Sequence, residues 1–170
     1  MKILKIMFSG LFLLFLLVGV RVFAADNDNI ILSGTVASIL SLVLTEEGSY
    51  NDLTLTANGA DVDVANVVVE CNDPDGYTVT MVTANGATGG LFEGADAQNS
   101  ETLAYSVKYG AGGSEAAVTF VAGSKEVEST SARSTVGGDT RNILISWTAP
   151  GTPLSADTYS DTLTLTIAAK

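Results

Sequence analysis

TYSDTLTLTI, residues 158–167, is the stretch that decides the fold of this chain. Its odd-numbered positions are mostly apolar, whereas every even-numbered position is Ser or Thr. Successive side chains of a β-strand point to opposite faces, so this alternation predicts a strand with one face on a core and the other in water.

The same alternation recurs upstream in three clear segments, Tyr77–Met81, Leu103–Tyr109 and Ile143–Trp147. In each segment the apolar residues occupy every second position, and Gly, Asn and Asp fall between the segments, as turn chemistry requires. Trp147, the single tryptophan, shares the apolar side of its segment and is expected to face the core. No amphipathic helix of useful length is predicted downstream of residue 24.

Four earlier segments have a less regular pattern. Ile30–Val36 and Ile39–Thr45 are predicted as strands, and Leu53–Thr56 as a short one. Val62–Cys71 is apolar at both odd and even positions near its end, which predicts a central strand covered on both faces. Altogether about eight or nine short strands, with turn signals every 8–12 residues, favour a single all-β domain built as a two-sheet antiparallel sandwich.

Two regions between the strands are rich in residues that disfavour long strands. Residues 84–100 contain many glycines, and residues 123–140 contain many Ser, Thr and Gly. We expect them to form long loops or the edges of the sheets.

The first residues have the pattern of an export signal. Lys2 and Lys5 precede an apolar run, Ile6–Val20, and small residues suited to signal peptidase follow, with cleavage expected after Ala24. The alternative is an uncleaved anchor, but the apolar run is shorter than the ~20 residues of a spanning helix. We therefore expect residues 1–24 to be a helical signal peptide. Residues 25–170 are expected to be a secreted domain, in the periplasm or on the bacterial cell surface, without membrane insertion after cleavage.

Charge and cysteine content limit the possible partners. The formal net charge is −11, and cleavage would remove three basic residues and no acidic one. Such an acidic protein repels nucleic acid, so nucleic-acid binding is not expected. Cys71 is the only cysteine, so no internal disulfide can form, and a buried, unreactive thiol is expected.

The residue types do not suit an enzyme. The chain has no histidine, which excludes imidazole bases and histidine-ligated metals, and no phosphate-binding glycine loop occurs. A hydrolase using carboxylates alone remains a third hypothesis. Asp161 shares the apolar side of its strand, and we expect it at the strand end, bonded to loop amides. We predict no catalytic residue and no cofactor.

Two weak signals support a binding module instead. Asp26–Asn29 and the pair Asp61 and Asp63 offer oxygen ligands for calcium, although neither matches an EF-hand loop, so no metal site is predicted. Tyr50 is the one aromatic residue placed to form an exposed platform for a sugar. A monomeric carbohydrate- or calcium-binding domain is therefore the alternative function.

Several short motifs resemble secreted bacterial domains of the spore coat protein U and fimbrial-subunit type. They are the run VVVECNDPDGYTVT at 67–80, LAYSV at 103–107, ILISW at 143–147 and ADTYSDTLTLTI at 156–167. The resemblance implies an immunoglobulin-like sandwich at the cell surface, assembled with a periplasmic chaperone and an usher. Many relatives carry a cysteine pair, whereas Cys71 here has no mate.

In that family a subunit lacks one strand, and the N-terminal extension of a neighbouring copy or a related subunit fills the gap. The resemblance makes Asn29–Val36 the candidate donor, with Ile30, Leu32, Gly34 and Val36 on one side. The alternative is that these residues form the first strand of a complete sandwich. The leading hypothesis is a non-enzymatic structural or adhesive subunit of a surface appendage such as a fimbria.

Overall fold

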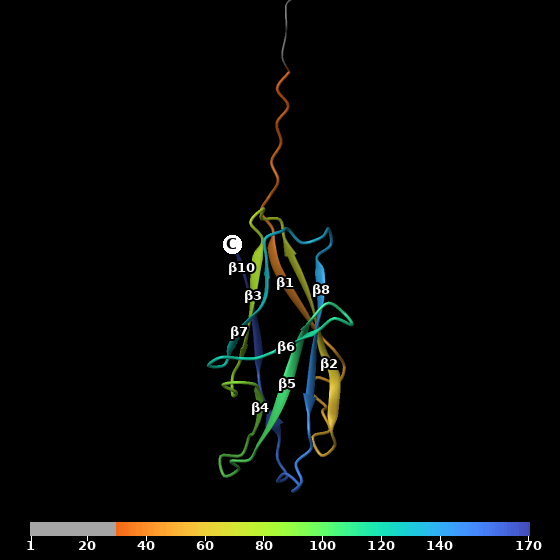
Figure 1. Ribbon diagram of the computed structural model, residues 1–170, viewed down its shortest axis with the longest axis vertical. Helices are drawn as coiled ribbons and strands as arrows, with labels where there is room; N and C mark the ends of the chain where they lie inside the picture. The colour runs from red at the N-terminus through yellow and green to blue at the C-terminus, as the bar shows by residue number, and fades with distance from the viewer. Residues whose placement is uncertain (1–29) are drawn as a thin grey trace, which may run out of the picture. The chain divides into compact units, whose positions relative to one another are not determined.

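The computed structural model describes residues 30–170, so the signal peptide expected at 1–24 and the Asp/Asn run at 26–29 lie outside the described residues. Residues 36–170 form one compact unit that contains ten β-strands (Figure 1). Residues 30–170 contain no helix, and accordingly no helix in this range could cross a membrane.

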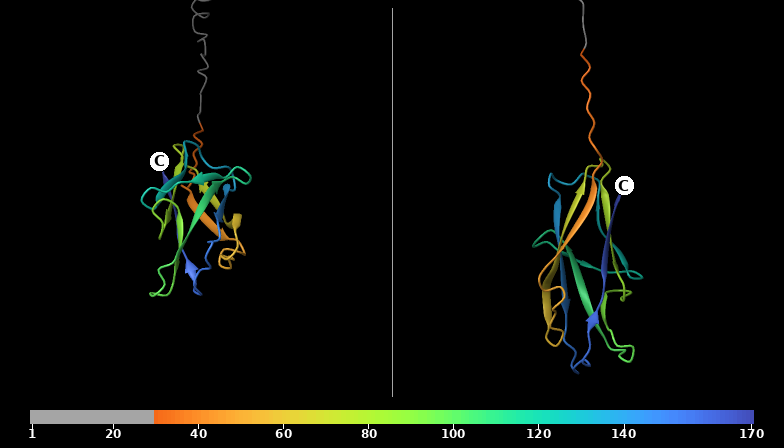
Figure 2. Two further views of the ribbon diagram at one scale, coloured as in Figure 1. Left: turned by 60° about the horizontal axis from the view of Figure 1, so that its bottom comes forward. Right: turned by 180° about the vertical axis from the view of Figure 1, so that it is seen from behind.

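The strands form two antiparallel sheets, as the alternating segments predicted. The larger sheet has the order β1 (Leu40–Glu46), β2 (Gly59–Cys71), β8 (Asp139–Trp147), β5 (Thr102–Gly110), β4 (Gly90–Gly94) and β9 (Tyr159–Ser160), and β6 (Ala116–Val118) also pairs with β5. The smaller sheet has the order β10 (Leu163–Ala169), β3 (Tyr77–Thr83) and β7 (Ser124–Thr130). The larger sheet curls around the smaller one, which gives a sandwich-like arrangement (Figures 1 and 2).

The core lies between the two sheets and is built from alternate residues of the strands. Val67 and Val69 of β2 are fully buried, as are Val79 and Met81 of β3. Other buried members are Tyr105, Val107, Phe120, Ile143 and Ile145. The period of two thus gives each strand one buried face. Cys71 is buried and free, as expected of a small apolar side chain.

Trp147 is buried in this core, as expected. Its indole Nε1 donates a hydrogen bond of 2.8 Å to the carbonyl oxygen of Ala57. The ring lies directly over Gly59, where a Cβ atom would overlap the indole. Gly59 is therefore required for the close approach of β2 and the tryptophan.

Three details differ from the expectations. Residues 30–36 and 53–56 form no strand, and residues 53–56 belong instead to a segment of turns. β2 is a central strand, between β1 and β8, as predicted, but its two faces are not equally covered: Val67 and Val69 are buried, whereas Val68, on the other face, is only partly buried. Residues 84–100 and 123–140 contain β4 and β7, and β7 is indeed a sheet edge.

Candidate functional site

The first and last long strands, β1 and β10, are edges of different sheets, and the space between them is open. On β1, Leu40 and Leu44 lie directly opposite Cys71 and Val67 of β2. Directly opposite residues share a face of the sheet, so both leucines point toward the core. Leu40 is nevertheless 43% exposed and Leu44 40%, although their partners are buried.

The apolar side of β10 is also incompletely covered. Leu163, Leu165 and Ile167 pair with residues of β3 that are buried, yet all three are only partly buried themselves. Within residues 30–170, no strand pairs with the outer edge of β10 or with that of β1. Core-facing side chains on both strands are therefore accessible from outside.

A groove of about 310 Å³ lies along these two strands. We call it the apolar groove. Its walls include Leu44 of β1 and Leu163 and Leu165 of β10, and its floor includes the core residues Ile143 and Ile145. The groove thus opens directly onto the interior of the sandwich.

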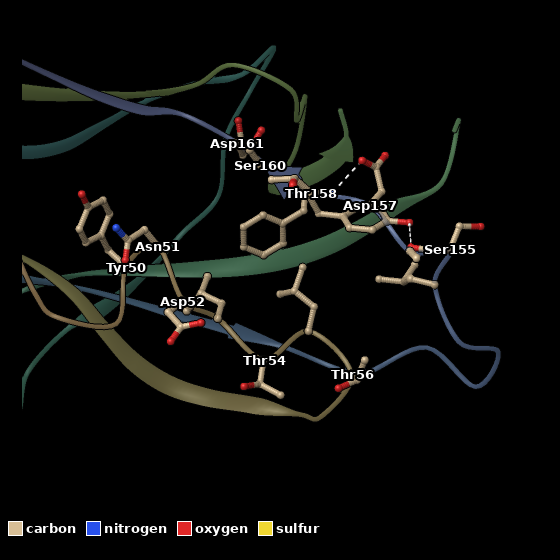
Figure 3. Close-up of a pocket in the computed structure, with 16 residues that line it drawn as sticks. Tyr50, Asn51, Asp52, Thr54, Thr56, Ser155, Asp157, Thr158, Ser160 and Asp161 are labelled. Carbon is tan, nitrogen blue, oxygen red and sulfur yellow. Dashed lines mark hydrogen bonds between the residues drawn. The ribbon is translucent and has the colours of Figure 1, made fainter. Parts of the chain in front are cut away.

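A second, more polar depression of about 730 Å³ adjoins the apolar groove and is called the polar cleft. Residues 50–56 form one wall and residues 154–161 the other (Figure 3). Leu53 and Phe92 line it together with Thr, Ser, Asn and Asp side chains. The polar cleft and the apolar groove share Tyr50, Leu53, Phe92 and Asp161, so they are continuous.

Asp161 lies where the groove meets the cleft, just before β10 begins. One carboxylate oxygen, Oδ2, accepts hydrogen bonds from Thr83 Oγ1 at 2.7 Å, Tyr105 OH at 2.8 Å and the backbone N–H of Leu91 at 3.1 Å. The other oxygen, Oδ1, accepts bonds from the N–H groups of residues 85 and 162. Burial raises the pKa of Asp161, but the hydrogen bonds outweigh it and the pKa is lowered. Asp161 is therefore at the strand end and bonded to loop amides, as expected.

The wall formed by residues 154–161 is held in place by a second network. Asp157 Oδ2 accepts bonds from the N–H of Asp96 at 3.0 Å and from Asn99 Nδ2 at 2.8 Å. The Tyr159 hydroxyl donates to Glu101 Oε2 at 3.0 Å, and Glu101 also accepts a bond from the N–H of Ser155. The bonds from Asp96 and Asn99 lower the pKa of Asp157, because they stabilise its charged form.

The candidate donor residues lie outside the strands. Ile30, Leu32 and Val36 are 86%, 90% and 88% exposed, and a Cβ added to Gly34 would meet no atom within 4 Å. Residues 30–36 therefore form no strand, and these apolar side chains are exposed. Tyr50, the candidate sugar platform, is exposed and lines the polar cleft.

Of the calcium ligands considered from the sequence, Asp61 and Asp63 lie within the described residues, and their surroundings do not suit a metal ion. Asp61 instead forms a salt bridge of 2.8 Å with Lys108 and accepts a hydrogen bond from Ser146. Burial is the main reason that the pKa of Asp63 is raised. Among residues 30–170, no group of three or more acidic, Cys or His side chains is arranged to hold a metal ion.

A partly buried ionic cluster, which no sequence pattern predicted, joins the two sheets away from the groove. Glu128 of β7 bonds to Arg141 of β8, with 2.5 Å between Oε1 and a guanidinium nitrogen. The hydroxyls of Tyr77 and Tyr109 also donate to Glu128, each at 3.0 Å. Burial raises the pKa of both tyrosines. The only sequence signal for this cluster was that Arg141, like the core residue Ile143, occupies an odd-numbered position of its strand.

The groove and the cleft were not predictable from the sequence either, because each combines side chains more than 100 residues apart. A comparison with protein-family models and with curated proteins gives no match.

Proposed function

We propose that this protein is a non-enzymatic structural or adhesive subunit of a bacterial surface appendage, with an immunoglobulin-like fold completed by a strand from another copy. The observation that carries the proposal is the incomplete burial of core-facing leucines on both sides of the apolar groove, Leu44 on one side and Leu163 and Leu165 on the other. Exposed apolar surface of this kind is a binding surface or an aggregation liability.

The chemistry of the groove suits an extended peptide. The outer edges of β1 and β10 present backbone N–H and C=O groups that an added strand can pair with. Alternate side chains of such a strand would point into the groove, where Leu44, Leu163 and Leu165 supply apolar contacts. The occupant should therefore be apolar at every second position.

The segment Ile30–Val36 of a second copy has this pattern. Ile30, Leu32 and Val36 lie on one side of it, and seven extended residues span about 23 Å, comparable with the seven-residue strands β1 and β10. Their 86–90% exposure leaves an apolar surface without cover in the single copy. Because donor segment and groove are different surfaces, the contact is heterologous and can continue into a fibre.

Export to the periplasm or the cell surface, with a chaperone that protects the groove before assembly, belongs to the same proposal. The signal-peptide pattern of residues 1–24 and the resemblance to fimbrial subunits support it. An unprotected groove would expose sheet edges and apolar side chains together, which favours aggregation.

The decisive experiment compares the mature protein, residues 25–170, with a variant that lacks residues 25–36. We expect the mature protein to form oligomers that resist dissociation, as measured by size-exclusion chromatography with light scattering. The shortened variant should be monomeric with an unchanged far-UV circular dichroism spectrum, because residues 36–170 contain all ten strands.

A matched pair of point variants locates the contact. Leu32→Asp would place a charge in the apolar groove and should abolish oligomers, whereas Ser33→Asp, on the opposite side of the same segment, should leave them intact. If the deletion instead unfolds a monomeric protein, the segment is an internal strand and the subunit proposal is wrong.

A further inference from the structure

The polar cleft presents hydrogen-bonding groups on two facing walls (Figure 3). Asp52 and Thr54 stand on one wall and Thr158 on the other. Among the side-chain hydrogen bonds of residues 30–170, none uses the Asp52 carboxylate or the hydroxyls of these two threonines. The cleft thus offers both donors and acceptors to a ligand that carries hydroxyl groups.

One wall is rigid before any ligand arrives. Asp157 is held by Asp96 and Asn99, and Tyr159 is fixed between Asn99 Nδ2 at 3.0 Å and Glu101 Oε2. Asp157 Oδ1 accepts only the N–H of Thr158, at 2.7 Å, so it can accept a further bond from a ligand. A wall whose side chains are already ordered loses little conformational entropy on binding.

The floor of the cleft is apolar. Leu53, Phe92 and Leu154 line it, and Tyr50, which is 43% exposed, stands at its edge. A sugar ring has hydroxyl groups around its edge and C–H groups on its faces. Polar walls over an apolar floor therefore match both parts of a sugar.

The charge of the cleft restricts the type of sugar. Asp52, Asp157 and Asp161 line it, and no Lys or Arg does. Carboxylates without a nearby cation repel uronic acids, sialic acids and sulfated or phosphorylated sugars. The volume of about 730 Å³ lies within the ~300–1,000 Å³ typical of small-ligand sites. We propose that the polar cleft binds a neutral oligosaccharide.

An extended peptide is a poorer occupant for this cleft. Peptides that add to a sheet need a long, unpaired strand edge. Here one wall is the turn segment 50–56, and the only strand in the other wall is β9, which has two residues and is already paired with β4. The peptide-type site is the apolar groove, which shares only four residues with the cleft.

Binding can be tested on the mature protein with a defined panel of probes. Neutral gluco-, manno-, galacto- and xylo-oligosaccharides are titrated by calorimetry and by NMR chemical-shift mapping, with an oligogalacturonate as the anionic probe. At least one neutral oligosaccharide should bind and shift the resonances of residues 50–56 and 154–161, and the oligogalacturonate should not bind.

Point variants then assign the contacts. Thr158→Val and Asp52→Ala each remove a hydrogen-bonding group from one wall and should weaken binding about tenfold. Thr164→Val, an equal change on the exposed side of β10, should have no effect. Neither wall variant should lower the melting temperature, because neither side chain is bonded within residues 30–170.

The proposal is wrong if no neutral oligosaccharide of the panel binds, if the oligogalacturonate binds equally well, or if Thr164→Val weakens binding as much as Thr158→Val. These outcomes are independent of strand exchange. Deleting residues 25–36 removes no residue of the cleft, so the shortened monomer should bind the same oligosaccharide with the same affinity.

Discussion

The hydroxyl group of Tyr105 donates a hydrogen bond of 2.8 Å to Asp161 Oδ2, and this bond joins β5 of the larger sheet to the start of β10 in the smaller sheet. Asp161 also accepts bonds from the Thr83 hydroxyl and from the backbone N–H of Leu91 in β4. One carboxylate therefore fixes the position of β10 beside the apolar groove. Asp161, a charged residue at an otherwise apolar position of the alternating pattern, therefore connects the two sheets.

Replacing Asp161 should destabilise the protein strongly. Asp161→Ala leaves the Tyr105 hydroxyl and several N–H groups without an acceptor, at a cost of about 2–4 kcal/mol in the free energy of unfolding. Urea unfolding of the variant and of the wild type measures this loss of stability. A loss below ~0.5 kcal/mol would show that water replaces the carboxylate and that the network is not a structural connection.

The titration of Asp161 also predicts how the stability of the protein changes in acid. The pKa of Asp161 is lowered in the folded protein, so its stabilising contribution is complete above the unfolded pKa of about 4 and is lost as the pH falls through the lower, folded value. The wild type should lose stability below about pH 4. Asp161→Asn should lose less over that range, as measured by urea unfolding at pH 2.5, 4 and 7. Parallel curves for the two proteins would contradict this assignment.

The partly buried ionic cluster of Glu128 and Arg141 should contribute more to stability than an exposed ion pair does. Arg141→Ala removes the cation that neutralises Glu128, whose side chain is only 13% exposed, and should cost about 3 kcal/mol. Lys108→Ala breaks the exposed pair with Asp61 and should cost less than ~1 kcal/mol. Chemical denaturation at neutral pH compares the free energies of unfolding of the two variants. Equal losses would mean that the Arg141 cluster is as well hydrated as the surface pair.

Gly59 should be intolerant of any side chain. A methyl group at this position overlaps the ring of Trp147, so Gly59→Ala should cost about 1–3 kcal/mol and change the tryptophan fluorescence. Gly48→Ala is the control, because a Cβ there meets no atom within 4 Å. A Gly59→Ala protein as stable as Gly48→Ala, with unchanged emission, would show that Trp147 can move without cost.

A separate peptide should fill the apolar groove. A synthetic peptide of residues 25–38 is expected to bind the protein lacking residues 25–36 and to stabilise it by about 2.7 kcal/mol at a hundredfold excess over its Kd. Thermal unfolding with and without peptide measures this. A peptide with Leu32→Asp is the control, and equal stabilisation by both peptides would show that binding does not use the apolar side.

The strands of the sandwich were largely predictable because their information is local. Alternation over five to ten residues predicted β3, β5, β8 and β10, since each of these strands has one face on the core. The short strands β6 and β9 carry too few residues for a period to be seen. Residues Ile30–Val36 are also largely apolar at every second position, yet they form no strand, because a strand also needs a paired neighbour.

The candidate sites depended on contacts that the sequence does not record. Tyr50 was identified as an exposed aromatic residue, but its cleft is formed with residues 154–161, about 100 positions away. Likewise, Arg141 gives no sequence signal of its partner Glu128, because β7 and β8 belong to different sheets.

By itself, the sequence determined that residues 40–169 contain paired strands around one core, because the period of the side chains is a property of the chain alone. Residue type likewise determined that no internal disulfide stabilises these strands and that they carry no histidine. Only the tertiary structure decided which strands became edges. With β1 and β10 on the edges of different sheets, leucines that face the core remain accessible, and the burial of a side chain depends on what the fold places next to it.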